Sequence, residues 1–181
     1  EYLASFVLRL CQQDAPSGNE QVATLSFLRN FLRSSSTLNV LELGAGVGLT
    51  GLEIASQIKH SRVLLTDLES ALPLLKRNLC RNQRRFLENA VRAQRLEWGN
   101  DDDIERALEW IDTSAPLLIL GSDCVYWEHL HRPLEETIAS LLRRVPNALC
   151  LLAGVRRWKR DNQFYQNLGK KRKNLLCTVV D

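Results

Sequence analysis

The chain has 181 residues, of which 45% are hydrophobic and 25% charged, with a formal net charge of +3 at pH 7. This is typical of one globular domain with a sizeable core, and the small net charge does not by itself indicate a nucleic-acid partner. No apolar run is long enough to cross a membrane, the first ten residues lack the basic start of a signal peptide, and five scattered cysteines without a C-x-x-C pair predict reduced thiols and no metal site.

Apolar periodicity and turn residues predict helices and strands that alternate along the chain. Helices are expected over residues 21–32, 49–58, 70–83, 101–111 and 132–145, with another starting at 161. Strands are expected over residues 39–44, 62–68, 90–99, 116–126, 147–155 and 174–181. This alternation is typical of right-handed β-α-β units, so we predict an α/β fold with a doubly wound, mostly parallel sheet and helices on both faces.

We find no internal repeat and no linker along the chain. The sequence therefore predicts a single domain over residues 1–181, with an N-terminal helical segment over 1–38 and a sheet core over 39–181.

A glycine-rich turn follows the first strand, in "VLELGAGVGLTGL". Gly46, Gly48 and Gly51 fit the G-x-G-x-x-G pattern of dinucleotide-binding turns, although a tight strand-to-helix turn alone would also use glycine. Asp67 lies 21 positions after Gly46 and ends the second strand. An acidic residue there binds ribose hydroxyls in such folds; the alternative is a helix N-cap, and we favour the ribose role.

The charge of Glu42 separates the possible nucleotides. It lies two residues before Gly44 and would place a carboxylate near a bound pyrophosphate, which is unfavourable. A cofactor that carries a sulfonium and an ammonium group would be attracted instead. No Gly-Lys-Ser/Thr follows the glycines, so a P-loop is excluded. The turn therefore predicts S-adenosylmethionine as the cofactor.

The glycine motif resembles the first motif of the seven-strand S-adenosylmethionine-dependent methyltransferases. The likeness continues in "LLTDL", "LEWG", "LILGSDCVYWEHLHRPLEETI" and "LLAGVRRWKRDNQF". Together these stretches resemble the methyltransferase-like protein lysine methyltransferases, a family with members that act on chaperones and elongation factors. The resemblance implies a Rossmann-like sheet of seven strands.

The resemblance also implies roles for residues at the strand ends. Gly44, Ala45 and Gly46 would contact the methionine part of the cofactor and Asp67 would hold its ribose. Trp98 would pack near the adenine, and the alternative for Trp98 is a core tryptophan at a strand end. Ser122 would line the cofactor wall.

Asp123 and Tyr126 are the predicted catalytic residues. They lie three positions apart just past the fourth strand, where a carboxylate and a phenol can position a lysine amine and stabilise the positive charge that forms on it. The alternative is that Asp123 caps the next helix and Tyr126 packs beneath it. Cys124 and Val125 stand where enzymes that methylate base amino groups carry prolines, so a flipped base is disfavoured.

A protein substrate, such as a chaperone or translation factor, is what the resemblance implies. We expect a monomer in the cytoplasm, with the nucleus as an alternative location. The family usually has a tryptophan near the position of Val22, and "NEQVATLSF" has none. Three alternatives stay open: a methyltransferase for arginine, histidine, a small molecule or nucleic acid; a nicotinamide-dependent oxidoreductase; and a binding module without catalysis.

Overall fold

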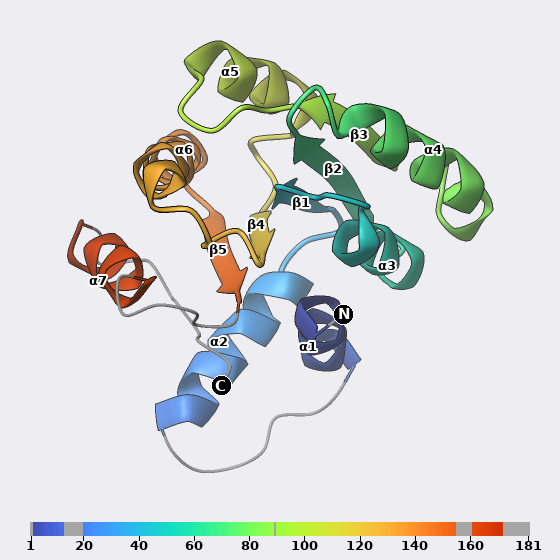
Figure 1. Cartoon of the computed structure of the whole chain (residues 1–181). Helices are drawn as coiled ribbons and strands as arrows, with labels where there is room; N and C mark the ends of the chain where they lie inside the picture. Colours follow the sequence, from blue (N-terminus) through green and yellow to red (C-terminus); the bar gives the residue numbers. More distant parts are fainter. Residues whose placement is uncertain (1, 13–19, 89, 155–160, 172–181) are drawn as a thin grey trace.

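Five parallel strands form one sheet at the centre of the molecule (Figure 1). The structure is a computed structural model that describes residues 2–12, 20–88, 90–154 and 161–171. The sheet has the order β3-β2-β1-β4-β5, with every neighbouring pair parallel. The strands are β1 (Leu38–Leu43), β2 (Ser61–Asp67), β3 (Val91–Arg95), β4 (Leu117–Ser122) and β5 (Ala148–Ala153).

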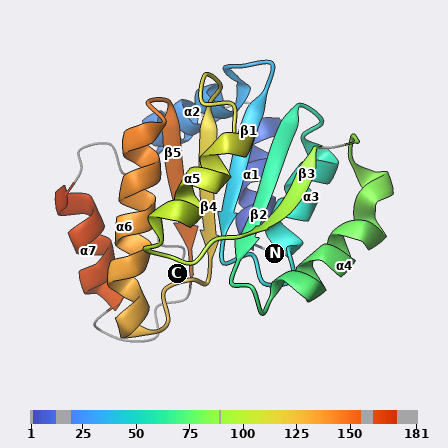
Figure 2. The same cartoon turned by 90° about the horizontal axis from the view of Figure 1, so that it is seen from above.

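Helices cover both faces of the sheet, as the sequence predicts. They are α1 (Tyr2–Gln12), α2 (Glu20–Arg33), α3 (Leu49–Gln57), α4 (Leu72–Asn82), the 3₁₀ helix η1 (Gln83–Arg85), α5 (Asp101–Trp110), α6 (Glu128–Arg144) and α7 (Asp161–Lys171). Figure 2 shows α5 and α6 in front of the sheet, α1 and α2 behind it, and α7 beside α6 at the β5 side. The fold is therefore doubly wound, and the predicted α/β class is confirmed.

Alternate residues of each strand pack into two separate hydrophobic clusters, one on each face of the sheet. In β4, Leu118 and Leu120 join the cluster that includes α1, α2 and α3, whereas Leu117 and Ile119 join the cluster that includes α5 and α6. Side chains of a strand point alternately to its two faces, so this split follows from the period of two. A strand buried on both faces needs an apolar residue at nearly every position, which explains the continuous apolar runs in the sequence.

Several element ends differ from the sequence predictions. The sheet has five strands where the resemblance implies seven, and the strand predicted over 174–181 lies outside the described residues. The third strand stops at Arg95 and the fourth at Ser122, and the residues predicted to continue them lie in loops, where Leu96, Cys124 and Val125 are buried. Apolar residues there extend the strand-like sequence pattern without extending the strand.

The described helices include none that is long and apolar enough to cross a bilayer.

Gly51 sets how closely α3 approaches the sheet. A Cβ atom at this position would lie 2.3 Å from Leu65 Cδ2 and 2.7 Å from Glu42 Oε2. We expect Gly51→Ala to lower the free energy of unfolding by about 1–3 kcal/mol, because overpacking forces the helix away from β2. Urea denaturation measures this, with Gln57→Ala, at an exposed position of the same helix, as the control. Equal midpoints for the two variants would contradict the prediction.

Candidate active site

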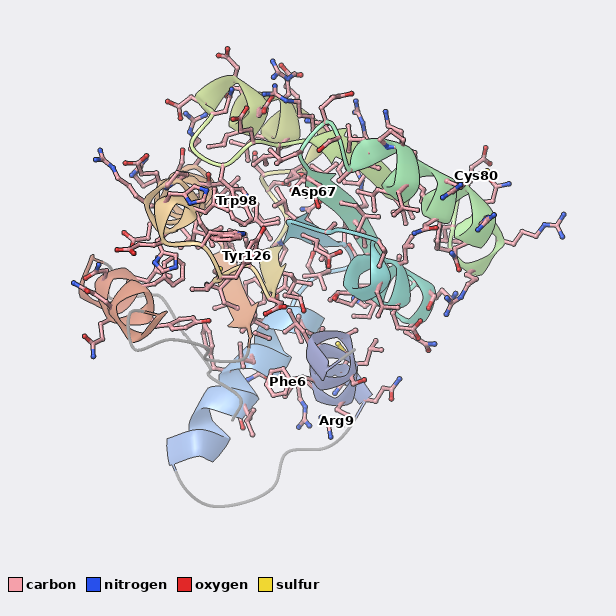
Figure 3. The ribbon with its side chains drawn as sticks, viewed as in Figure 1. Phe6, Arg9, Asp67, Cys80, Trp98 and Tyr126 are labelled. Carbon is pink, nitrogen blue, oxygen red and sulfur yellow. The ribbon has the colours of Figure 1, made fainter. Side chains whose placement is uncertain are left out.

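The loops that follow β1, β2, β3 and β4 meet at one edge of the sheet. Parallel strands end on the same side, so residues far apart in the sequence converge there. In Figure 3, Asp67, Trp98 and Tyr126 lie around this edge, whereas Phe6 and Arg9 lie on α1 and Cys80 lies on α4. The structure therefore brings the predicted site residues together in one region.

The glycine loop turns the chain from β1 into α3 with three glycines at positive φ. Gly44, Gly46 and Gly48 have φ of 62°, 56° and 81°, a region that other residues rarely adopt. The Ala45 N–H donates to the Thr66 carbonyl at 2.9 Å, and the Gly48 N–H donates to the Ala45 carbonyl at 2.7 Å. The first bond holds the loop against β2, and the second closes a turn within the loop.

Two of these glycines differ in their surroundings. A Cβ atom on Gly44 would lie 3.1 Å from Trp98 Cζ2 and 3.2 Å from Cys124 Sγ, so the Trp98 ring packs directly on the loop. A Cβ atom on Gly46 would have no atom within 4 Å among the described residues. Packing therefore does not require a glycine at Gly46, and the space beside it is open to a ligand.

The Asp67 carboxylate closes the loop from the end of β2. Its Oδ2 accepts a hydrogen bond from the Gly46 N–H at 2.7 Å, and its Oδ1 accepts one from the Leu68 N–H at 2.7 Å. The side chain is only partly buried, and each carboxylate oxygen has a further lone pair. Asp67 can therefore hold the loop and accept bonds from ligand hydroxyls at the same time.

Glu42 lies beneath the glycine loop and points toward α3. Its side chain is 2% exposed, and its Oε2 accepts a hydrogen bond from the Gly51 N–H at 2.9 Å. One N–H of the first turn of α3 is thereby already used by a carboxylate, in a position where dinucleotide-binding folds place a pyrophosphate. The predicted role of Glu42 beside the cofactor stays a prediction, because its carboxyl group bonds to the N-terminal turn of α3.

Burial raises the pKa of Glu42 from an ordinary value of 4.5 to about 7. Hydrogen bonds from Gly51 and Thr50 act in the opposite direction, and the nearby charge of Asp67 adds to the rise. The folded protein therefore holds this proton more tightly than the unfolded chain does. As pH rises from about 4.5 to about 7, this group lowers the free energy of unfolding, and above that range its contribution is constant.

We expect Glu42→Gln to remove this pH dependence, since glutamine does not ionise and its oxygen still accepts from Gly51. Relative to the unchanged protein, the variant gains on the order of 3 kcal/mol in stability between about pH 5 and about pH 8. Urea denaturation of both proteins at the two pH values measures the gain. A stability difference that is the same at both pH values would contradict it.

Cys124 connects the loop after β4 to the end of β1. Its buried thiol donates to the Leu43 carbonyl at 3.1 Å, and burial, reinforced by the charges of Glu42, Asp67 and Asp123, raises its pKa to about 12. The group therefore stays a thiol and acts as a hydrogen-bond donor. The sequence analysis assigns Cys124 no role and notes only that enzymes that methylate bases carry a proline there, although Cys124 lies between the two predicted catalytic residues.

Asp123 is the one non-glycine residue with positive φ in the described part of the chain, at 58°. It follows Ser122 at the end of β4, and its N–H donates to the Ala153 carbonyl at 2.7 Å. Aspartate tolerates this left-handed conformation better than most residues, and such strain is found at functional sites. The turn leaves the Asp123 side chain exposed at the same edge as the glycine loop.

Tyr126 is 41% exposed and the next residue, Trp127, is 59% exposed. The two rings meet edge to face with centroids 6.3 Å apart. Partial burial raises the pKa of the Tyr126 phenol, and Cys124, Asp67 and Asp123 add to the rise. Tyr126 therefore carries its proton at neutral pH. It does not pack beneath a helix, which was the alternative interpretation, and Trp127 is a neighbour that the sequence analysis did not single out.

Comparison with known proteins decides the family. A model of the lysine methyltransferase family matches residues 8–171. The chain belongs to the lysine methyltransferase family. This confirms the family resemblance seen in the sequence.

Individual relatives support the same assignment. The protein-lysine N-methyltransferase EFM6 of Saccharomyces cerevisiae is 32% identical over 136 residues, which cover 71% of this chain and 54% of EFM6. The protein N-lysine methyltransferase METTL21A of Danio rerio is 33% identical over 137 residues, which cover 73% of this chain and 56% of METTL21A. The chain spans about half the length of these curated relatives.

A dehydrogenase/reductase from Sinorhizobium meliloti superposes with a TM-score of 0.52 at 11% identity, covering 83% of this chain and 73% of that one. At this identity the likeness shows the α/β fold alone.

Proposed function

We propose that this chain transfers a methyl group from S-adenosylmethionine to lysine side chains of a folded protein. Family membership supports the reaction class, and relatives named as protein-lysine methyltransferases support the acceptor. The observation that carries the proposal is that the glycine loop, Asp67, Trp98, Asp123 and Tyr126 all follow strand ends at one edge of the sheet, where one side of Gly46 is open.

The residues present fit an adenosyl cofactor. Asp67 offers carboxylate oxygens for ribose hydroxyls, Trp98 offers a ring face for the adenine, and the open side of Gly46 leaves room for the methionine part. Ala45 and Ser122 would complete the wall, as the family resemblance implies. When bound, S-adenosylmethionine supplies a methyl group activated by a sulfonium.

The acceptor amine must enter without its proton, because only the neutral nitrogen has a free electron pair. The Asp123 carboxylate and the Tyr126 phenol oxygen can accept hydrogen bonds from the amine hydrogens and orient that electron pair. Positive charge then develops on the nitrogen, and the Asp123 carboxylate stabilises it. Both side chains are exposed, so the proton released by the lysine passes to solvent.

The proposal is tested by incubating the protein with a labelled methyl donor and a lysate from cells that lack the protein. We expect label in methyllysine of one or a few proteins, identified by mass spectrometry of the digested product. Label in methylarginine, methylhistidine or nucleic acid would contradict the lysine assignment. A chaperone or translation factor as substrate, a monomer, and a cytoplasmic location with the nucleus as the alternative are further proposals that rest on the family resemblance.

A further inference from the structure

The exposed side of α4 and η1 carries an unusual concentration of positive charge. Between residues 76 and 92 the chain has six basic side chains and one acidic side chain, Glu88, although the net charge of the whole chain is only +3. The net positive charge of this segment therefore exceeds that of the whole chain, so the remaining residues together have a net negative charge.

Four of these side chains are exposed along α4 and η1. Leu72 and Leu75 are buried, whereas Lys76, Arg77, Arg81 and Arg84 are exposed. Arg77 and Arg81 are about one turn apart on one face of α4, and Arg84 follows just beyond the end of α4 in η1. We call these four residues the α4 basic face.

Within the described part of the chain, no acidic side chain forms an ion pair with the α4 basic face. The nearby Arg85 differs, because it bonds to Glu53 at 2.8 Å. One cation near a helix C-terminus is explained by the helix dipole, but like charges four residues apart repel and destabilise a helix. Folding therefore does not account for this cluster.

Helix α4, which carries the basic face, contacts the glycine loop of the candidate active site. Asn78, on the same helix, donates to the Val47 carbonyl of the glycine loop at 2.9 Å. Two leucines, Leu74 and Leu87, are 40% and 60% exposed at the ends of the segment. In Figure 3, α4 with the labelled Cys80 lies at the periphery of the molecule.

We infer that the α4 basic face docks an acidic protein surface and so orients a protein substrate beside the active site. Arginine is favoured at protein interfaces and pairs with carboxylates in a two-bond geometry. The exposed large neighbours are aliphatic, which suits a protein partner, whereas surfaces that bind single-stranded nucleic acid interleave aromatic rings with basic residues. This inference extends the proposed function, but a binding experiment tests it without methyl transfer.

The test measures fluorescence anisotropy with a short labelled peptide rich in glutamate and leucine, and with a labelled single-stranded RNA. The variant Arg77→Glu/Arg81→Glu/Arg84→Glu reverses three of the four charges of the α4 basic face. The control variant Arg9→Glu/Arg33→Glu/Arg143→Glu changes the net charge equally at exposed positions elsewhere. Circular dichroism checks that both are folded, and the Arg→Gln versions of the same positions serve if charge reversal prevents folding.

We expect the unchanged protein to bind the peptide more tightly than the RNA, the face variant to lose roughly tenfold or more in affinity, and the control to change little. Three results would overturn the inference: no peptide binding by the unchanged protein, tighter binding of the single-stranded RNA than of the peptide, or equal losses of affinity in both variants. Because no cofactor is present, these outcomes do not depend on whether the protein methylates lysine.

Discussion

Asp123→Asn is expected to slow methyl transfer by about 100-fold or more while cofactor affinity stays within about threefold of the unchanged protein. Asparagine keeps the shape of the side chain and tolerates the positive φ at this position, so the backbone turn survives. Only the negative charge is lost. Alanine would add backbone strain at a φ of 58°, so the effect of the lost charge could not be separated from the effect of the strain.

Single-turnover methylation of the identified substrate and calorimetry with S-adenosylhomocysteine separate chemistry from binding. Asp102→Asn, on exposed α5, is the matched control and should leave both unchanged. An Asp123→Asn protein with full activity would show that this carboxylate does not stabilise the forming charge, and would return Asp123 to a purely structural role.

Asp67→Ala is expected to weaken S-adenosylmethionine binding by about 100-fold, the loss from removing two hydrogen bonds to a charged acceptor. The same change removes the acceptor of the Gly46 and Leu68 N–H groups, so we also expect a modest fall in stability of about 1 kcal/mol. Calorimetry measures the affinity and urea denaturation the stability.

Glu69→Ala, two residues further along and exposed, is the control for Asp67→Ala. If Asp67 only holds the glycine loop, Asp67→Ala lowers the stability, and the cofactor affinity falls only by a small factor that matches this destabilisation. Unchanged cofactor affinity in a destabilised Asp67→Ala protein would contradict the ribose role.

The sequence predicted the convergence of the site because it depends on strand periodicity and chain order. Gly44, Asp67 and Ser122 each end a buried apolar run, and parallel strands carry such ends to one edge. The same reasoning explains the doubly wound sheet, since alternate residues of each strand must be covered on both faces.

The features of the site that the sequence did not predict arise from tertiary contacts. Glu42 shares a face with Val40, so its carboxylate turns toward α3, and the partner Gly51 is nine positions away. Period two along β1 would have predicted that direction, but not the partner. The positive φ of Asp123 and the burial of Cys124 arise from the loop after β4 packing against β1 and β5, which local propensity does not encode.

The most direct test of the central claim is isothermal titration of the protein with S-adenosylmethionine, S-adenosylhomocysteine and NAD. We expect both adenosyl compounds to bind with one-to-one stoichiometry and NAD to give no heat, because the Glu42 carboxyl group already accepts the Gly51 N–H at the end of α3 where a pyrophosphate would otherwise bind. Binding of NAD, or no binding of either adenosyl compound, would contradict the assignment of this sheet edge as a methyl-donor site.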